Sequence, residues 1–157
     1  MANPLLRRRV AYSNGFVDVV SPSQYVEKLV TFTGAAGLGD QGAVPIFDVT
    51  GVVIIDRLVP VCEEDLAGGS ATLALGVTGA TTALIAATTA TDIDNGEYWM
   101  TNTPGATALA VPAGLKDIAV AADIIGTVGT ADVTAGAIRF CCWYTPVSSD
   151  GALVAAA

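Results

Sequence analysis

The sequence predicts an all-β, single-domain β-sandwich of jelly-roll-like type, with an immunoglobulin-like sandwich as the alternative. Lys and Glu are too few to cover the surfaces of long amphipathic helices, whereas Thr, Val, Ala and Gly are abundant. Apolar and polar residues alternate in several short runs, and glycine-rich turn signals separate these runs. The chain of 157 residues is long enough for one domain with a proper core.

The clearest strand pattern lies within residues 118–146, where two β-type runs flank a connection rich in Gly, Thr, Asp and Ala. In the second run, four alternate residues share one parity: Ile138, Phe140, Cys142 and Tyr144. Because side chains alternate between the two faces of a strand, these residues point the same way, and we expect Tyr144 to face the core. We therefore predict a β-hairpin over this range at the centre of the sandwich.

The other predicted strands cover, in order, residues 24–33, 46–49, 52–62, 71–77, 83–89, 97–101 and 106–111. The run 52–62 is apolar on both faces except at Asp56 and Arg57, which is typical of a central strand. Residues 34–42 are expected to form a glycine-rich loop and residues 63–69 a turn. Because Ala dominates residues 83–90, a short helix is the alternative there.

The chain is expected to divide into three parts. Residues 1–22 form an N-terminal arm, residues 23–148 the sandwich domain and residues 149–157 a C-terminal tail of small residues. No periodicity in the arm is long enough to predict a strand or a helix. We expect no signal peptide, because no apolar segment follows the arginines near the N-terminus, and no membrane span, because glycines and threonines interrupt the uncharged stretch 66–91.

Charge and composition argue against several classes of function. The net charge is −8 and only seven residues are basic, so a nucleic-acid-binding role is not expected. The chain contains no histidine, which excludes catalytic triads that depend on one. No pattern indicates an Asp dyad or a Ser–Lys pair. We therefore expect no enzyme, no cofactor and no metal site.

Three local motifs have the composition of ligand sites, but we favour a structural interpretation of each. Residues 37–42 match GxGxxG, yet no helix is predicted after them, so a plain loop is expected. Residues 92–97 resemble a calcium loop whose spacing departs from an EF-hand, and the pair Asn95 and Gly96 favours a turn. The acidic residues 63–65 are expected in a solvated turn.

The three cysteines, Cys62, Cys141 and Cys142, are an odd number and lack the spacing of a metal site. Cys141 and Cys142 are adjacent in a predicted strand, so their side chains should point to opposite faces. We expect buried, reduced thiols that act as small hydrophobic residues in a chain assembled in a reducing cytoplasm.

Two parts of the chain carry a resemblance. They are GDQGAVPIFDVTG at residues 39–51, and ADII at 122–125 followed by GTADVTAGAI at 129–138. They resemble small virion proteins of tailed bacteriophages, and the likeness covers about residues 24–150. It implies a capsid decoration or cement protein, a β-sandwich that is often a homotrimer and has no catalytic residues. Its partners would be the major capsid protein and further copies of itself, on the capsid exterior after synthesis in the host cytoplasm.

The alternatives are a phage tail, fibre or head–tail joining component, or a carbohydrate-binding module. The expected interface residues are Arg7, Arg8, Arg9, Trp99, Ile125 and Trp143. The arginine run is either a solvated, disordered segment or a basic arm that docks on the acidic surface of another copy or another partner, because the rest of the chain is acidic. Large aromatic residues concentrate binding energy at interfaces. We expect Ile125, Cys141 and Trp143 to share one uncovered face of the predicted hairpin.

Overall fold

The computed structural model describes the backbone of residues 7–12 and 15–20, and residues 23–157 in full. The strands are β1 (Arg7–Tyr12), β2 (Gly15–Val20), β3 (Gln24–Thr31), β4 (Gly42–Thr50), β5 (Val53–Ala67), β6 (Thr72–Val77), β7 (Ala80–Thr89), β8 (Ile118–Val120), β9 (Ile124–Gly129), β10 (Ala135–Pro146) and β11 (Ala152–Ala155). Two single-turn 3₁₀ helices, η1 (Ala90–Asp92) and η2 (Ala113–Leu115), lie between β7 and β8.

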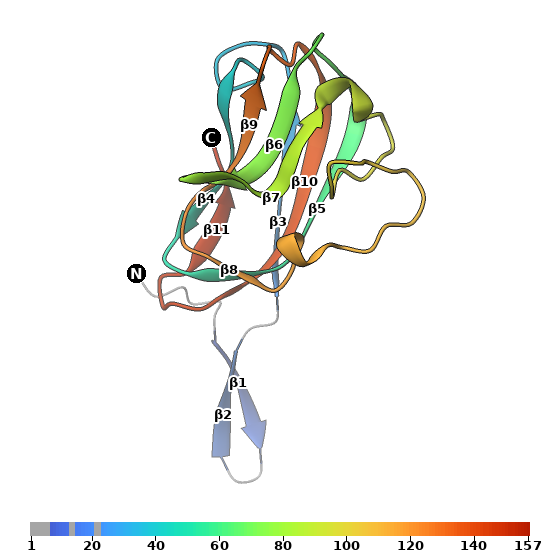
Figure 1. The fold of residues 1–157 in the computed structure, drawn as a ribbon. Coiled ribbons are helices and arrows are strands. Elements are labelled where there is room, and N and C mark those ends of the chain that lie inside the picture. Colours follow the sequence, from blue (N-terminus) through green and yellow to red (C-terminus); the bar gives the residue numbers. More distant parts are fainter. Residues whose placement is uncertain (1–6, 13–14, 21–22) are drawn as a thin grey trace.

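The predicted all-β sandwich is confirmed. One sheet has four strands in the order β3-β10-β5-β8, and the other has five in the order β11-β4-β9-β6-β7. Every pair of neighbouring strands is antiparallel. Figure 1 shows the two sheets packed face to face, with β6 and β7 in front of β10 and β5. Within the described residues, no helix is long and apolar enough to cross a membrane.

Most connections pass from one sheet to the other. Among strands β3 to β11, only β6 and β7 are consecutive in the chain and neighbours in one sheet. Their connection is the two-residue turn Thr78–Gly79, and Gly79 adopts a positive φ of 91°. Because consecutive strands otherwise face each other across the core, strand pairing joins segments that are distant in the sequence.

The hairpin predicted over residues 118–146 is wrong. Its first run is divided into β8, which pairs with β5, and β9, which pairs with β4 and β6. Its second run is β10, which pairs with β3 and β5 in the other sheet. The connection between β9 and β10 crosses the sandwich, and Val133 within it is fully buried. The strand pattern was therefore correct, but β9 and β10 do not pair with each other.

The core lies between the two sheets and is built from alternate residues of each strand. Ile138, Phe140, Cys142 and Tyr144 all face it, as their shared parity predicted. Phe140 makes an edge-on contact with Trp99, with ring centroids 6.4 Å apart. Each large apolar side chain that is fully buried contributes about 1.5–3 kcal/mol to stability.

Three predicted local assignments and one alternative were wrong. The turn expected at residues 63–69 begins later, because β5 continues to Ala67 through bulges against β10. No strand forms at residues 106–111. At residues 97–101 only Tyr98 forms bridges, with Val61 and Gly105. The helix alternative for residues 83–90 does not occur, because β7 extends to Thr89.

Both chain ends contain strands that the sequence pattern did not predict. In the N-terminal arm, β1 and β2 pair with each other in a two-stranded sheet of their own. In the C-terminal tail, β11 adds an edge strand beside β4, from Ala152 opposite Thr50 to Ala155 opposite Phe47. The side chains of the arm, including those of Arg7, Arg8 and Arg9, lie outside the described residues.

Lys28 links the two sheets at one side of the sandwich. Its side chain leaves β3 and its Nζ donates hydrogen bonds to the carbonyls of Pro45, at 3.0 Å, and Ala156, at 2.9 Å. Partial burial lowers the pKa of Lys28, and the charge of Asp48 opposes that shift. The last residues of the chain are therefore attached to β4 by backbone pairing and to β3 by a lysine.

A candidate interaction surface on the four-stranded sheet

The outward side of the four-stranded sheet carries an unusual set of side chains. Strand alternation directs every second residue of β3, β10 and β5 away from the core. We call this set the outer face; its members are Tyr25, Glu27, Leu29, Arg57, Val59, Val61, Glu63, Arg139, Cys141 and Trp143. In the strand register they form a grid across three neighbouring strands.

One row of the grid is aromatic and cationic. Trp143 on β10 lies opposite Tyr25 on β3 and opposite Arg57 on β5. The ring centroids of Tyr25 and Trp143 are 4.9 Å apart and the rings are tilted by 48°. The guanidinium carbon of Arg57 lies 4.2 Å from the indole centroid, a cation–π contact. The indole is therefore held between a tyrosine and an arginine.

A β-bulge in β5 positions Arg57. Between the pairs formed by Trp143 and Tyr144, β5 contains one extra residue, so Asp56 and Arg57 share the space of one position. The carboxylate of Asp56 accepts hydrogen bonds from Thr145 Oγ1, at 2.9 Å, and from Ser23 Oγ. At the bulge, the Asp56 carboxylate has its hydrogen-bond donors in two nearby hydroxyl groups. The side chain of Arg57 is directed over the indole of Trp143.

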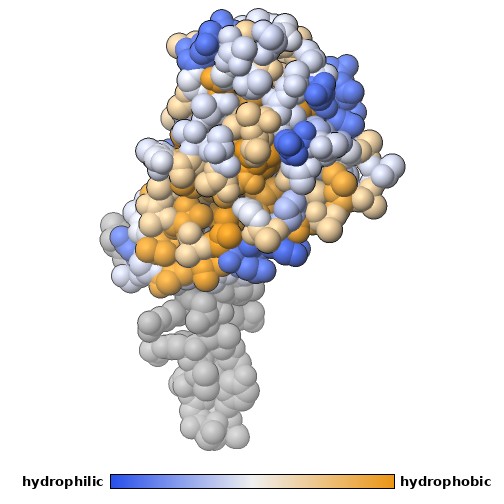
Figure 2. Space-filling view, viewed as in Figure 1, coloured by the Kyte–Doolittle hydropathy of each residue, from blue (hydrophilic) through white to orange (hydrophobic). Residues whose placement is uncertain are grey.

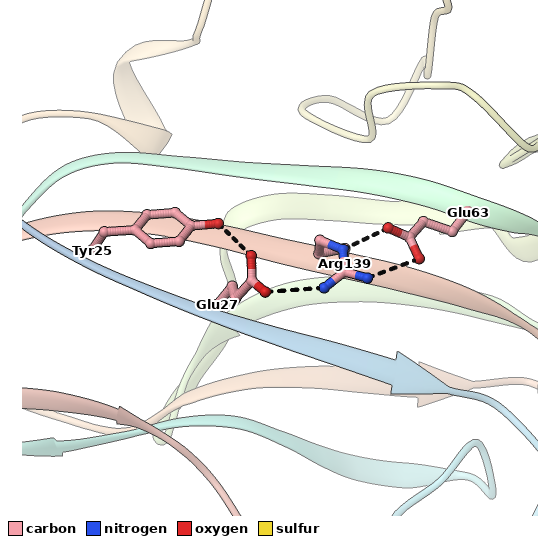
Figure 3. Close-up of polar contacts among 4 residues, drawn as sticks. All are labelled: Tyr25, Glu27, Glu63 and Arg139. Carbon is pink, nitrogen blue, oxygen red and sulfur yellow. Dashed lines mark hydrogen bonds and ion pairs between the residues drawn. The ribbon is translucent and has the colours of Figure 1, made fainter.

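The next rows contain an ion-pair chain (Figure 3). Arg139 Nε and Nη2 donate to the two carboxylate oxygens of Glu63 at 2.5 and 3.2 Å, and Nη1 donates to Glu27 at 3.1 Å. The hydroxyl of Tyr25 donates to the second oxygen of Glu27 at 2.5 Å. Bidentate contacts of this kind hold the side chains in one geometry, although at an exposed position they add little stability.

These contacts shift several pKa values. The hydrogen bonds from Arg139 lower the pKa of Glu63, and the same contacts raise the pKa of Arg139. Hydrogen bonding to Cys141 and then to Glu27 raises the pKa of Tyr25. The tyrosine therefore keeps its proton, and its hydroxyl remains a donor to the carboxylate throughout the neutral range.

Apolar side chains fill the space between the charged groups. Leu29 on β3 is 43% exposed and Tyr25 is 49% exposed. Val59 and Val61 on β5 are half-buried, and Tyr98 extends the surface beyond β5 through its bridge with Val61. A surface that combines exposed aromatic and apolar groups with arginines has the composition of protein interfaces.

The expected interface residues lie in three different places. Trp143 is half-exposed on the outer face, as proposed for an interface residue. Trp99 was wrongly assigned to the surface: it is fully buried, and its Nε1 donates to the buried Thr88 Oγ1 at 2.9 Å. Trp99 and its neighbour Tyr98 point to opposite sides, because the segment continues the sheet beside β5.

Ile125 does not share a face with Trp143. It is half-buried on β9, opposite Pro45 and Gly76, on the outward side of the five-stranded sheet. The expectation of a single uncovered face failed because β9 and β10 belong to different sheets. Cys141 is half-exposed on the outer face, in the row below Trp143.

Sequence reasoning missed Tyr25, Arg57 and Arg139 as members of the surface. A signal for Tyr25 was present, because it shares the parity of the polar Glu27 in the first predicted strand. The position of Arg57 depends on the bulge, and the contacts of Arg139 depend on which strands flank β10. Neither could be inferred from alternation within a single strand.

The remaining motifs take structural roles. In the GxGxxG segment, the carbonyl of Gly39 accepts a hydrogen bond from the Val133 amide at 2.7 Å, and no helix follows. In the calcium-like segment, Asn95 and Gly96 form the expected turn, and the Asn95 amide donates to Asp65 Oδ1 at 2.7 Å. Among the described residues, no group of three or more His, Cys, Asp or Glu side chains could hold a metal ion.

All three cysteines are free. Cys62 and Cys142 are buried as expected, whereas Cys141 is half-exposed. Burial raises the pKa of Cys62 to about 11 and that of Cys142 to about 12. These two thiols therefore stay protonated in the folded protein and behave as small apolar side chains.

The opposite side of the molecule has a different character. Figure 2 shows hydrophobic residues gathered in the lower part of the sandwich in this view, near β11. Val154 on β11 is 53% exposed. No aromatic–arginine stack occurs there among the residues that the structure describes. The outer face of the four-stranded sheet is therefore the stronger candidate for specific binding.

Comparison with known proteins identifies no relative. No family model, no curated protein and no solved structure matches this chain.

Proposed function

We propose that this chain is a structural protein of a tailed-bacteriophage virion, a decoration or cement protein that binds the capsid shell and stabilises the head. The observation that carries the proposal is the row formed by Tyr25, Trp143 and Arg57 on the outer face. Trp, Tyr and Arg are the residues that most often dominate binding energy at protein interfaces. The resemblance of residues 39–51 and 122–138 to phage virion proteins supports the choice of partner.

The role is one of binding rather than catalysis, and the major capsid protein is the partner. In the row, the side chains of Arg57 and Tyr25 hold the indole of Trp143 in place before any partner arrives. A surface that is already ordered loses less conformational entropy on binding. A rigid antiparallel sandwich suits a protein that reinforces a shell from the capsid exterior.

A carbohydrate-binding role fits the same surface less well. Sugar rings stack on open aromatic faces, whereas the Trp143 indole lies between Arg57 and Tyr25. Tyr25 offers exposed ring surface, but its hydroxyl is engaged by Glu27. The arrangement favours contact with a protein surface that carries its own apolar and acidic groups.

The test is a co-sedimentation assay with purified phage heads that lack the chain. We expect the wild-type protein to bind the heads and to raise the temperature at which they disrupt. Tyr25→Ala and Trp143→Ala should each weaken binding about tenfold or more. Val154→Ala, which truncates an exposed side chain on the other sheet, is the matched control and should bind as the wild type does.

Two results would overturn the proposal. One is failure to bind heads together with binding to a glycan array, which would indicate a carbohydrate-binding module. The other is the presence of only a few copies in each purified virion, which would indicate a tail, fibre or head–tail joining component.

A further inference from the structure

The outer face carries different charges at its two ends. Arg57 is exposed at one end of β5, and Glu63 and Glu64 are exposed at the other. Glu63 follows Arg57 by six positions of extended strand, a span of about 20 Å. Val59 and Val61 lie between them and are half-buried. Along β5 the surface therefore runs from a cation, through two valines, to carboxylates, and the Arg139–Glu27 ion pair lies beside those valines on β10 and β3.

The charged residues close to Arg57 and to Glu63 do not cancel the difference in charge between the two ends of the outer face. Asp56 adjoins Arg57, but it is half-buried and accepts hydrogen bonds from Ser23 and Thr145, whereas Arg57 is exposed. Toward the other end, Arg139 pairs with Glu63 and also with Glu27, which lies in the row of Val59, and so offsets only one of these two carboxylates. With the exposed carboxylate of Glu64, that end keeps a net negative charge.

We propose that two copies of this chain pack face to face through the outer face, related by a two-fold axis that sets β5 antiparallel to β5 of the second copy. A two-fold contact requires a surface that complements itself. Here each Arg57 would lie opposite Glu63 and Glu64 of the second copy. Beside the axis, Val59 of each copy would meet Val61 of the other, and Leu29 of each copy would lie against the Glu27 row of the other, next to the Arg139–Glu27 ion pair.

This pairing goes beyond the proposed shell contact and can be tested without it. The two contacts use the same surface, so a protomer cannot make both at once. The dimer would therefore open before the chain binds a shell, and raising the protein concentration would slow binding per protomer. Solution mass measures the pairing, and co-sedimentation measures shell binding, so failure of one is distinguishable from failure of the other.

Sedimentation equilibrium of the full chain tests the proposal. The wild-type protein should have the mass of a dimer. Leu29→Glu places a carboxylate at an exposed position beside the axis, facing the Glu27 row of the second copy, and should weaken dimerisation about tenfold or more. Thr82→Glu, at an exposed position on β7 in the other sheet, is the matched control and should remain dimeric.

A charge exchange tests the orientation of the two copies. Arg57→Glu and Glu64→Arg should each weaken the dimer, because each places like charges opposite one another. The double variant Arg57→Glu/Glu64→Arg should restore it. Circular dichroism verifies folding, and Leu29→Glu decides the question if Arg57→Glu does not fold. A monomeric or trimeric wild type, or a double variant as weak as the single ones, would overturn the proposal.

Discussion

Trp143 on β10 and Arg57 on β5 are directly opposed in the strand register, and the guanidinium carbon lies 4.2 Å from the centroid of the indole. The contact depends on the bulge at Asp56, which shifts the register of β5 immediately beside it. The four-stranded sheet thus presents a large aromatic side chain to solvent while holding it on both sides. The other tryptophan, Trp99, is enclosed in the core.

The two tryptophans should differ sharply in their effect on stability. Trp99→Ala removes a fully buried indole and leaves Thr88 Oγ1 without its donor, so we expect a loss of about 3–5 kcal/mol. Trp143→Ala removes only a surface stack and a cation–π contact, so about 1–2 kcal/mol is expected. Urea unfolding monitored by far-UV circular dichroism gives both values. Equal losses would contradict the assignment of Trp143 to the outer face.

The three thiols should differ in reactivity. Cys141 is half-exposed, whereas Cys62 and Cys142 are buried and have raised pKa values. In the native protein, a thiol-specific chromogenic reagent should therefore modify one cysteine rapidly, and all three only after unfolding. Cys141→Ser should abolish the rapid phase. Rapid modification of a second cysteine in the native state would show that the sandwich opens readily.

Stability should decline in alkaline solution because of the buried thiols. Folding raises the thiol pKa from 9.0 to about 11 in Cys62 and about 12 in Cys142, chiefly through burial. As the pH rises, thiolates form in the unfolded chain at a lower pH than in the folded protein. The contribution of the two buried thiols to the unfolding free energy is therefore fully present below pH 9 and is lost as the pH rises toward 11–12. Each thiol contributes at most about 1.4 kcal/mol per pH unit in that interval.

The measurement that tests this is the slope of the unfolding free energy against pH, taken between pH 9 and pH 11 for the wild type and for a double cysteine variant. Cys62→Ala/Cys142→Ala should show a shallower slope than the wild type, whatever its stability at neutral pH. Identical slopes would mean that other groups control the alkaline decline.

Lys28 should be important for joining the two sheets. Lys28→Met keeps most of the apolar stem but removes the hydrogen bonds to the carbonyls of Pro45 and Ala156. We expect a loss of about 1.5–3 kcal/mol in unfolding free energy, because these bonds have a charged donor. Lys116→Met, at an exposed position, is the control and should change stability by less than about 0.5 kcal/mol. Hydrogen exchange at β11 should accelerate only in the Lys28 variant.

Local patterns predicted much of the fold. The strand predicted over residues 24–33 is confirmed by β3, and the shared parity of Ile138, Phe140, Cys142 and Tyr144 correctly placed these four residues in the core. The glycine-rich loop before β4 was also predicted correctly. These features depend on side-chain periodicity and on backbone freedom at glycine, both of which are local properties.

The candidate surface was predicted only in part. Trp143 was proposed as an interface residue, but it was grouped with Ile125, which lies on the other sheet. Trp99 could not be assigned by residue type, because a large aromatic side chain is equally suited to a core and to an interface. Burial is decided by which segments cover a residue, and those segments are distant in the sequence.

By itself, the sequence determined that this protein is an all-β sandwich, which residues share a face within each strand, and that the chain contains no histidine. Only the tertiary structure decided that β9 and β10 lie in opposite sheets, that Trp99 is inside and Trp143 outside, and that Arg57 lies over the indole. The physical reason is that strand pairing uses backbone hydrogen bonds, which are common to nearly all residues. Periodicity therefore indicates the faces of a strand but not its neighbours, and a surface built across three strands appears only when those neighbours are known.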